Sequence, residues 1–275
     1  MQLIVFDLDG TLLNGKGKLS PYTKETLARL ADRGIAYTVA TGRTLHAARH
    51  LLDGYGFGLP HVYKNGVMIW DPANDEVSHQ HYLNPQEVAH VLAAVTAQHI
   101  TPFVFTWGPE QRHVIYHADL RNETEQRLAR QFLKRREVEV RPASELPANA
   151  QITNISALGA VSAVHAVEAL IEQEPQLVAY AGPAWEGDDW RWIDIHHTDA
   201  SKGSAVDTLR AQLGAKRVIC FGDSDNDLSM FARADESYAP ENAGEHIKAA
   251  ATAVIGHHDE DGVARFLRER FELDR

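Results

Sequence analysis

The chain has almost no cysteine and no long hydrophobic run. Its single cysteine, Cys220, excludes a disulfide within the chain and lies inside the apolar run Val218–Phe221. We interpret Cys220 as a small core residue of a buried strand rather than as a nucleophile. No apolar stretch is long enough to cross a bilayer, so we expect no membrane partner. The N-terminus lacks a basic segment before a long apolar run, so we expect no signal peptide and a cytoplasmic location.

Positive charge is also scarce. Lys and Arg total 27 against 38 Asp and Glu, which gives a net charge of −11. This balance argues against general binding to nucleic acid or to anionic membranes. A local site can still be positive, so a small phosphorylated substrate is compatible with the composition. We find no indication of an obligate protein partner.

Strand and helix patterns alternate at both ends of the chain. Apolar runs at 3–6 and 36–40 flank a helical stripe that begins at Ser20-Pro21, a good cap and first turn. This alternation predicts an α/β fold with a Rossmann-like, doubly wound parallel sheet. It resumes after Ser201, with a helix and then the apolar run that contains Cys220.

The pattern changes between these two parts. Asn84-Pro85-Gln86-Glu87 predicts a helix start, and extended runs mixed with helices follow it. We therefore predict a discontinuous core and an inserted α+β domain. The core comprises residues 1–83 and 193–275, and the inserted domain comprises residues 84–192.

The first apolar run, Leu3–Phe6, is followed directly by an acidic residue, Asp7. Asp7 and Asp9 have one residue between them, so both carboxylates point roughly the same way along an extended chain. Two acids on one side are costly unless a cation or a shared proton lies between them. Gly10 then allows a tight turn. In open α/β sheets ligands bind just beyond such carboxyl ends of strands, so this is a candidate site.

Three other stretches follow strand ends or helix starts. Thr41-Gly42 offers a hydroxyl and a backbone N–H to a phosphate oxygen. Lys202 stands at a helix start, where its charge and the positive helix end can hold an anion. Gly222-Asp223-Ser224-Asp225-Asn226-Asp227 is rich in the oxygen ligands that suit Mg²⁺. Taken singly, each also has an ordinary structural explanation: a turn, a surface lysine or a solvated acidic loop.

Together these stretches resemble the haloacid dehalogenase superfamily. Its four motifs are Asp-x-Asp-Gly-Thr after an apolar strand, a Ser or Thr, a Lys, and Gly-Asp-x-x-Asn-Asp. They match Asp7 to Thr11, Thr41, Lys202, and Gly222 to Asp227, in the family's order. The large insert is similar to the cap of Cof-like sugar phosphatases. Residues 239–243 depart from that group's usual small-residue run with Met-Gly before Asn-Ala.

The resemblance implies an activity and roles for single residues. It implies a Mg²⁺-dependent phosphatase of small phosphorylated metabolites, sugar phosphates above all, with a cap that selects the leaving group. Asp7 would be the nucleophile, and Asp9 the general acid and base, which must enter the cycle protonated. It also implies that Mg²⁺ is bound by Asp7, Asp223 and the Asp9 backbone carbonyl, and that Asp227 anchors the acidic loop or a metal-bound water. The residues that would contact the phosphoryl oxygens are Thr41, Gly42, Lys202 and Asn226.

Two other functions fit the same motifs. A phosphosugar mutase would return the phosphoryl group to sugar, and a phosphate-binding sensor would use the site without catalysis. The histidine pairs His196-His197 and His257-His258 lack chelating spacing, so we interpret them as structural or surface residues.

Overall fold

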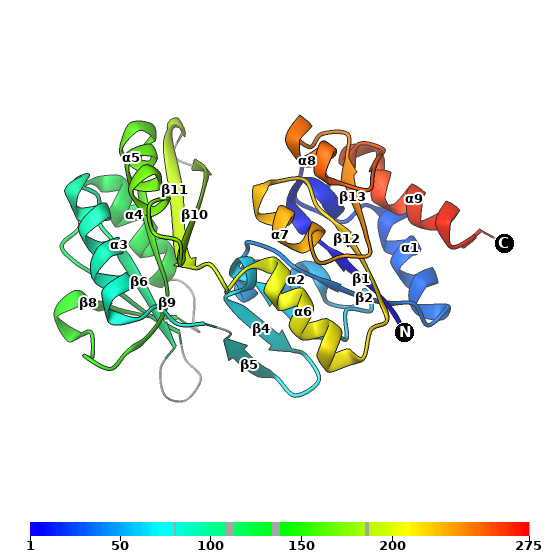
Figure 1. Cartoon of the computed structure of the whole chain (residues 1–275), viewed down its shortest axis with the longest axis horizontal. Helices are drawn as coiled ribbons and strands as arrows, with labels where there is room; N and C mark the ends of the chain where they lie inside the picture. Colours follow the sequence, from blue (N-terminus) through cyan, green and yellow to red (C-terminus); the bar gives the residue numbers. More distant parts are fainter. Residues whose placement is uncertain (80, 108–112, 134–137, 185–186, 275) are drawn as a thin grey trace. The chain divides into compact units, whose positions relative to one another are not determined.

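The computed structural model describes residues 1–79, 81–107, 113–133, 138–184 and 187–274 (Figure 1). It divides into two units, Met1–Gln80 with Ala200–Arg275, and His81–Asp199. In Figure 1 the first unit has the colours of the two ends of the sequence, blue at one end and orange to red at the other, and the second unit is mainly green. The predicted fold class is confirmed: a parallel α/β core with a separate second sheet. The second unit ends after Asp199 rather than Trp192, because strand β11 (Gly187–His197) runs on without a break.

The core sheet has five parallel strands in the order β14-β13-β12-β1-β2. Its strands are β1 (Gln2–Phe6), β2 (Ala36–Val39), β12 (Arg217–Phe221), β13 (Glu236–Pro240) and β14 (Ala253–Ile255). The first strand of the chain thus pairs with a neighbour made more than two hundred residues later. Parallel pairing brings the carboxyl ends of β1, β2 and β12 to one edge.

Helices cover both faces of this sheet, as expected for a parallel sheet. Leu3 and Val5 of β1 pack in one cluster with α6 (Lys202–Leu213), α7 (Leu228–Phe231) and α8 (Glu245–Ala250). Phe6 and Phe221 alternate to the other face, where Phe221 meets Phe266 at a ring distance of 5.8 Å.

Phe266 belongs to α9 (Gly262–Arg270), which lies beside α1 (Pro21–Asp32). The predicted start of α1 is confirmed, since Ser20 accepts a hydrogen bond from the Thr23 N–H.

A small antiparallel sheet follows helix α2 (Leu45–Leu52) and contains β3 (His61–Tyr63), β4 (Met68–Asp71) and β5 (Glu76–His79). Between β3 and β4 the turn η2 (Lys64–Gly66) has left-handed backbone at all three residues. A Cβ at Gly66 would overlap the backbone carbonyl of Ser201, the cap residue of α6. Glycine therefore lets this turn approach the start of α6, which positions the site described below.

The second unit is built on a six-stranded sheet. Its order is β10-β11-β9-β6-β7-β8, antiparallel except for the parallel pair β7 and β8. The strands other than β11 are β6 (Phe103–Trp107), β7 (His113–His117), β8 (Val138–Pro142), β9 (Gln151–Ala160) and β10 (Leu177–Ala184). Helices α3 (Pro85–Ala97) and α5 (Val161–Ile171) pack in one apolar cluster, and α4 (Glu123–Leu133) packs in another.

Sequence patterns found most of these elements and missed one. The predicted capping box at Asn84 is present, with both of its hydrogen bonds to and from Glu87. The sequence also predicts a charged helix from about Glu123 to Arg136. It is confirmed as far as Leu133, and residues 134–137 lie outside the described part. Strand β8 was not predicted because its mixed polar pattern, Val-Glu-Val-Arg-Pro, has few buried residues.

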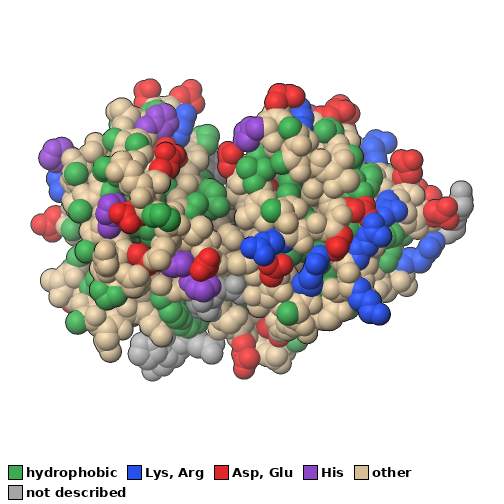
Figure 2. Space-filling view, viewed as in Figure 1, with side chains coloured by type: hydrophobic (Ala, Val, Ile, Leu, Met, Phe, Trp, Pro, Cys, Tyr) green, Lys and Arg blue, Asp and Glu red, His purple; other side chains and the backbone are tan. Residues whose placement is uncertain are grey.

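The outer surface carries charges of both signs, which are interspersed over the visible face in Figure 2. Among the described residues, none of the helices is long and apolar enough to cross a membrane. Cys220 is fully buried in the core cluster, as predicted.

The side chain of His61 is buried in the first unit. His61 is 2% exposed, and its Nε2 lies 3.1 Å from the Phe57 carbonyl oxygen. Because a carbonyl only accepts, Nε2 carries the proton, and Nδ1 accepts from the Tyr63 hydroxyl at 2.8 Å. Burial lowers the pKa of His61 to about 4, with smaller opposing effects from its neighbours.

We expect this histidine to make the protein less stable in mild acid. The unfolded imidazole takes up a proton below pH 6.5, whereas the folded one does so only near pH 4. The free energy of unfolding should therefore fall between these values, by about 3 kcal/mol at most from this group, and no further below them. Urea unfolding as a function of pH measures it.

The variant His61→Gln should lose this part of the pH dependence, and His165→Gln, at an exposed position on α5, should keep it. Equal slopes for His61→Gln and the unaltered chain would contradict the assignment.

Candidate active site

One lysine joins two acidic segments at the edge of the core sheet. Lys202, the first residue of α6, is fully buried, and its Nζ donates to Asp7 Oδ1 and to Asp227 Oδ1, both at 2.6 Å. Asp7 follows β1 directly, and its N–H donates to the Phe221 carbonyl of β12 at 2.9 Å. The parallel pairing of β1 and β12 thus fixes the backbone at Asp7, and Lys202 fixes its side chain.

The loop after β12 is held in a tight shape by Asp227. Its Oδ2 accepts from the backbone N–H groups of Asp223 and Ser224, at 2.8 and 3.0 Å. This arrangement turns the Asp223 carboxylate toward the first motif, where the Thr11 hydroxyl donates to Asp223 Oδ1 at 2.7 Å. Gly10 has a φ of +76°, and a Cβ there would overlap the Asp223 carboxylate. Glycine is needed at this position for both reasons.

Burial and mutual repulsion shift the pKa values of these groups. Burial raises the pKa of Asp7 well above its usual value, Lys202 lowers it, and the Asp227 and Asp223 carboxylates raise it again. Burial likewise raises the pKa of Asp223 to about 6, against the hydrogen bond from Thr11. The pKa of Lys202 is raised, because the two carboxylates outweigh the effect of burial, so the ammonium stays charged.

These residues are suited to a divalent cation. Asp7, Asp223 and Asp227 each offer an oxygen, and these oxygens lie within 4.8 Å of one another. Three carboxylates and one ammonium leave two net negative charges in a largely buried space. All the donors are oxygens, which is the ligand set that Mg²⁺ takes in proteins.

Asp9 lies in surroundings different from those expected. Its side chain is exposed, and both oxygens accept from Arg43, at 2.6 Å from Nε and 2.5 Å from Nη2. Such a bidentate pair is charge-assisted. Arg43 thus occupies both oxygens of Asp9, and it must move or find another anion before Asp9 can exchange a proton with substrate or water.

The predicted phosphate-binding residues lie on neighbouring segments. Thr41 is buried two residues beyond the end of β2, and its hydroxyl accepts from the Arg43 N–H at 3.1 Å. A Cβ at Gly42 would lie 2.9 Å from Asn65 Oδ1 and 3.6 Å from Asn226 Nδ2. The Asn226 amide donates to Asn65 Oδ1 at 2.8 Å. The structure therefore brings Gly42 and Asn226 together through a residue that sequence reasoning did not select.

Sequence reasoning missed four residues that shape this site, and each left a weak signal. Arg43 follows Thr41-Gly42 directly. Asn65-Gly66 is a tight-turn signal in the sequence, and the left-handed backbone of Asn65 (φ 58°) explains why asparagine suits this position. Thr11 was part of the first motif without a role. Asn242 donates to the Gly10 carbonyl at 2.8 Å and lies in the unusual 239–243 run.

Comparison with known proteins places this site in a family. The haloacid dehalogenase-like hydrolases match residues 4–267, which is nearly the whole chain. The chain therefore belongs to the haloacid dehalogenase-like hydrolases, as the four motifs predicted.

Named relatives and solved structures match over nearly their full length. The 5-amino-6-(5-phospho-D-ribitylamino)uracil phosphatase YitU of Bacillus subtilis is 28% identical, over 98% of each chain. The pyridoxal phosphate phosphatase YbhA of Escherichia coli is 25% identical, over 97% of each chain. A haloacid dehalogenase-like hydrolase from B. subtilis has a similar structure, with a TM-score of 0.76 and 26% identity over 98% of this chain and 99% of the other. These relatives agree with the predicted enzyme class.

We expect Lys202→Met to destabilise the protein strongly. The change leaves Asp7 and Asp227 buried without their shared cation, and breaking a buried ion pair in this way costs about 3–5 kcal/mol. Urea unfolding at neutral pH measures the loss. The deficit should shrink as pH falls, because protonated carboxyl groups no longer need the ammonium.

The exposed Lys216 supplies the control, and Lys216→Met should change the free energy of unfolding by less than about 0.5 kcal/mol. A similar small change for Lys202→Met would show that the buried lysine does not hold the site together.

Proposed function

We propose that this protein is a Mg²⁺-dependent phosphatase of small phosphorylated metabolites, sugar phosphates among them. The observation that carries this proposal is the buried group formed by Lys202, Asp7 and Asp227, with Asp223 beside it at the edge of the sheet. It combines a positioned carboxylate with an oxygen-lined cation site. The named relatives support it, since YitU and YbhA are phosphatases of small phosphorylated compounds.

The hydrogen bonds of the acids suggest how they divide the metal site. Lys202 occupies one oxygen of Asp7, and Asp227 uses both of its oxygens, for Lys202 and for two backbone N–H groups. We therefore assign Asp7 and Asp223 as Mg²⁺ ligands and Asp227 as the anchor of the loop. The family resemblance implies the Asp9 backbone carbonyl as a further ligand. Bound Mg²⁺ would neutralise charge on the phosphoryl oxygens.

Asp7 is the nucleophile in this proposal. One of its carboxylate oxygens attacks phosphorus, the ester P–O bond breaks, and an aspartyl-phosphate forms on Asp7. Water then attacks the same phosphorus, releases phosphate and restores the Asp7 carboxylate. Lys202, Thr41, Gly42 and Asn226 hold the phosphoryl oxygens during both steps, which demand mainly position and charge neutralisation.

Asp9 is the general acid and the general base in this proposal. It protonates the leaving oxygen in the first step and takes a proton from water in the second. In the structure its carboxylate is bound to Arg43, so an arriving phosphoryl group must compete for that guanidinium. Because phosphate oxygens are also good bidentate partners for arginine, substrate binding can free Asp9 for proton transfer.

We expect activity to require Mg²⁺ and to be poorly supported by Ca²⁺. The acids lie close together, and the larger, looser coordination of Ca²⁺ would hold the phosphoryl group less well. Phosphate release from a sugar phosphate, measured after exhaustive chelation and then after adding back either ion, tests this. Full activity in the chelated protein would refute the metal assignment.

Replacing Asp7 and replacing Asp9 should impair different steps of the reaction. Asp7→Asn removes the attacking oxygen, so no covalent intermediate should form. Asp9→Asn keeps the nucleophile but loses proton transfer, which contributes about 10²- to 10⁴-fold. With an activated ester such as a nitrophenyl phosphate, Asp9→Asn should accumulate phosphate on Asp7, because dephosphorylation still needs a base. Rapid-quench mass spectrometry detects this species.

Phosphate on another residue, or near-normal turnover by Asp7→Asn, would contradict the mechanism. The same assay, run over sugar phosphates and other phosphate esters, separates the phosphatase from a mutase, which would yield an isomer without free phosphate. A sensor would release phosphate from none of them.

A further inference from the structure

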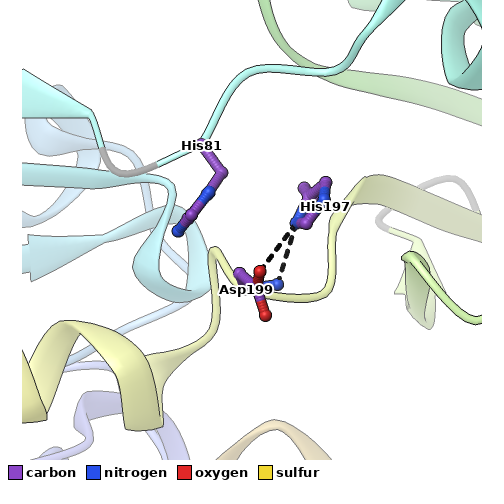
Figure 3. A group of neighbouring side chains, drawn as sticks. All are labelled: His81, His197 and Asp199. Carbon is purple, nitrogen blue, oxygen red and sulfur yellow. Dashed lines mark hydrogen bonds and ion pairs between the residues drawn. The ribbon is translucent and has the colours of Figure 1, made fainter.

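A second group of metal-ligating side chains lies within the other unit. His81 and Asp199 are the first and last residues of that unit, where the chain enters and leaves it, and His197 is at the end of β11. Figure 3 shows the three side chains close together. Each offers one ligand atom, and these atoms lie within 4.8 Å of one another.

We propose that His81, His197 and Asp199 form a site for a transition-metal ion such as Zn²⁺. Two imidazoles and one carboxylate are a donor set that zinc accepts, with water completing four-coordination. The site goes beyond the proposed phosphatase activity and does not depend on it. It also differs in chemistry from the acidic site of the first unit, because nitrogen donors select against Mg²⁺.

His197 has one ring nitrogen available as a ligand. Its Nδ1 accepts a hydrogen bond from the Asp199 N–H at 3.0 Å, so this nitrogen carries a lone pair and the proton is on Nε2. The same Nδ1 lies 3.8 Å from the Asp199 carboxylate (Figure 3). An ion at this place would replace the N–H donor and draw in the carboxylate.

A buried carboxylate faces the other nitrogen of this ring. Glu87 is 7% exposed, and its Oε2 is used by the Asn84 N–H in the capping box of α3. Its Oε1 is buried and lacks a hydrogen-bond partner among the described residues, yet it lies 3.8 Å from His197 Nε2. Metal-bound histidines commonly donate their second N–H to a carboxylate, which orients the ring and strengthens it as a ligand. Glu87 is placed for this role.

His81 must turn for the site to close. Its ring is stacked on that of His197, with centroids 5.1 Å apart and planes inclined by 17°. Nearly parallel stacked rings cannot both direct an in-plane lone pair at one ion. Binding therefore exchanges the stack for coordination, and it joins the segment that enters the unit to the segment that leaves it.

Co²⁺ tests the proposal, since it substitutes for Zn²⁺ and is coloured when four-coordinate. The full chain is freed of metal, supplied with excess Mg²⁺ to fill the oxygen site, and titrated with Co²⁺ while visible absorption is recorded. We expect one equivalent to bind and Zn²⁺ to displace it. The variants His81→Gln and His197→Gln should abolish the band.

Two further variants sharpen the result. Glu87→Gln can keep the capping box but loses the buried charge, so it should weaken binding by about 10- to 100-fold. His257→Gln alters a separate group of potential ligands in the first unit, His257, His258 and Asp259, and should leave the titration unchanged. If a histidine variant does not fold, the exposed Asp199→Asn takes its place, and Zn²⁺ should raise the melting temperature of the unaltered chain but not of this variant.

The proposal is overturned if Co²⁺ does not bind in excess Mg²⁺. It is equally overturned if the band survives the changes at His81 and His197, or if it disappears only in His257→Gln.

Discussion

A single buried ammonium group organises the core of this enzyme. Lys202 bonds to Asp7, which lies 195 positions before it, and to Asp227, which lies 25 positions after it. Without that charge, Asp7 and Asp227 would be buried with no cation to offset the cost of their ionisation. Because Asp227 also binds the backbone of its own loop, the lysine fixes both the first motif and the position of Asp223. The geometry of the acidic site and the local stability therefore rest on the same two hydrogen bonds.

Sequence patterns located this site because its residues follow strand ends. Apolar runs that stop at Asp7, Thr41 and Gly222 predict parallel strands, and parallel strands place their carboxyl ends at one edge. The start of α6 could also be predicted from the sequence, since Ser201 caps the helix and Lys202 occupies its first turn. What could be predicted was thus the fold, the position of the edge and the identity of most groups on it.

Other features depend on conformations and distant contacts that no local pattern encodes. Arg43 lies 34 positions after Asp9 in the chain, so their contact could not be predicted from a local pattern. Asn65 reaches Asn226 only because a left-handed turn points it there. His81 and His197 are brought together by the folding of the whole second unit, whereas adjacent histidines such as His196-His197 had been judged by sequence spacing alone.

The split core also sets an order on synthesis. β1 and β2 are synthesised before the second sheet, but β12, the other neighbour of β1, follows only after all strands of that sheet, which end at His197. The strands of that second sheet come from one continuous segment, so all of them are synthesised before the core sheet is complete. Meanwhile β1 has an unpaired edge and four apolar residues, Leu3 to Phe6, which are buried only in the finished protein. The nascent chain must keep this strand from pairing elsewhere until the segment bearing the acidic loop arrives to cover it.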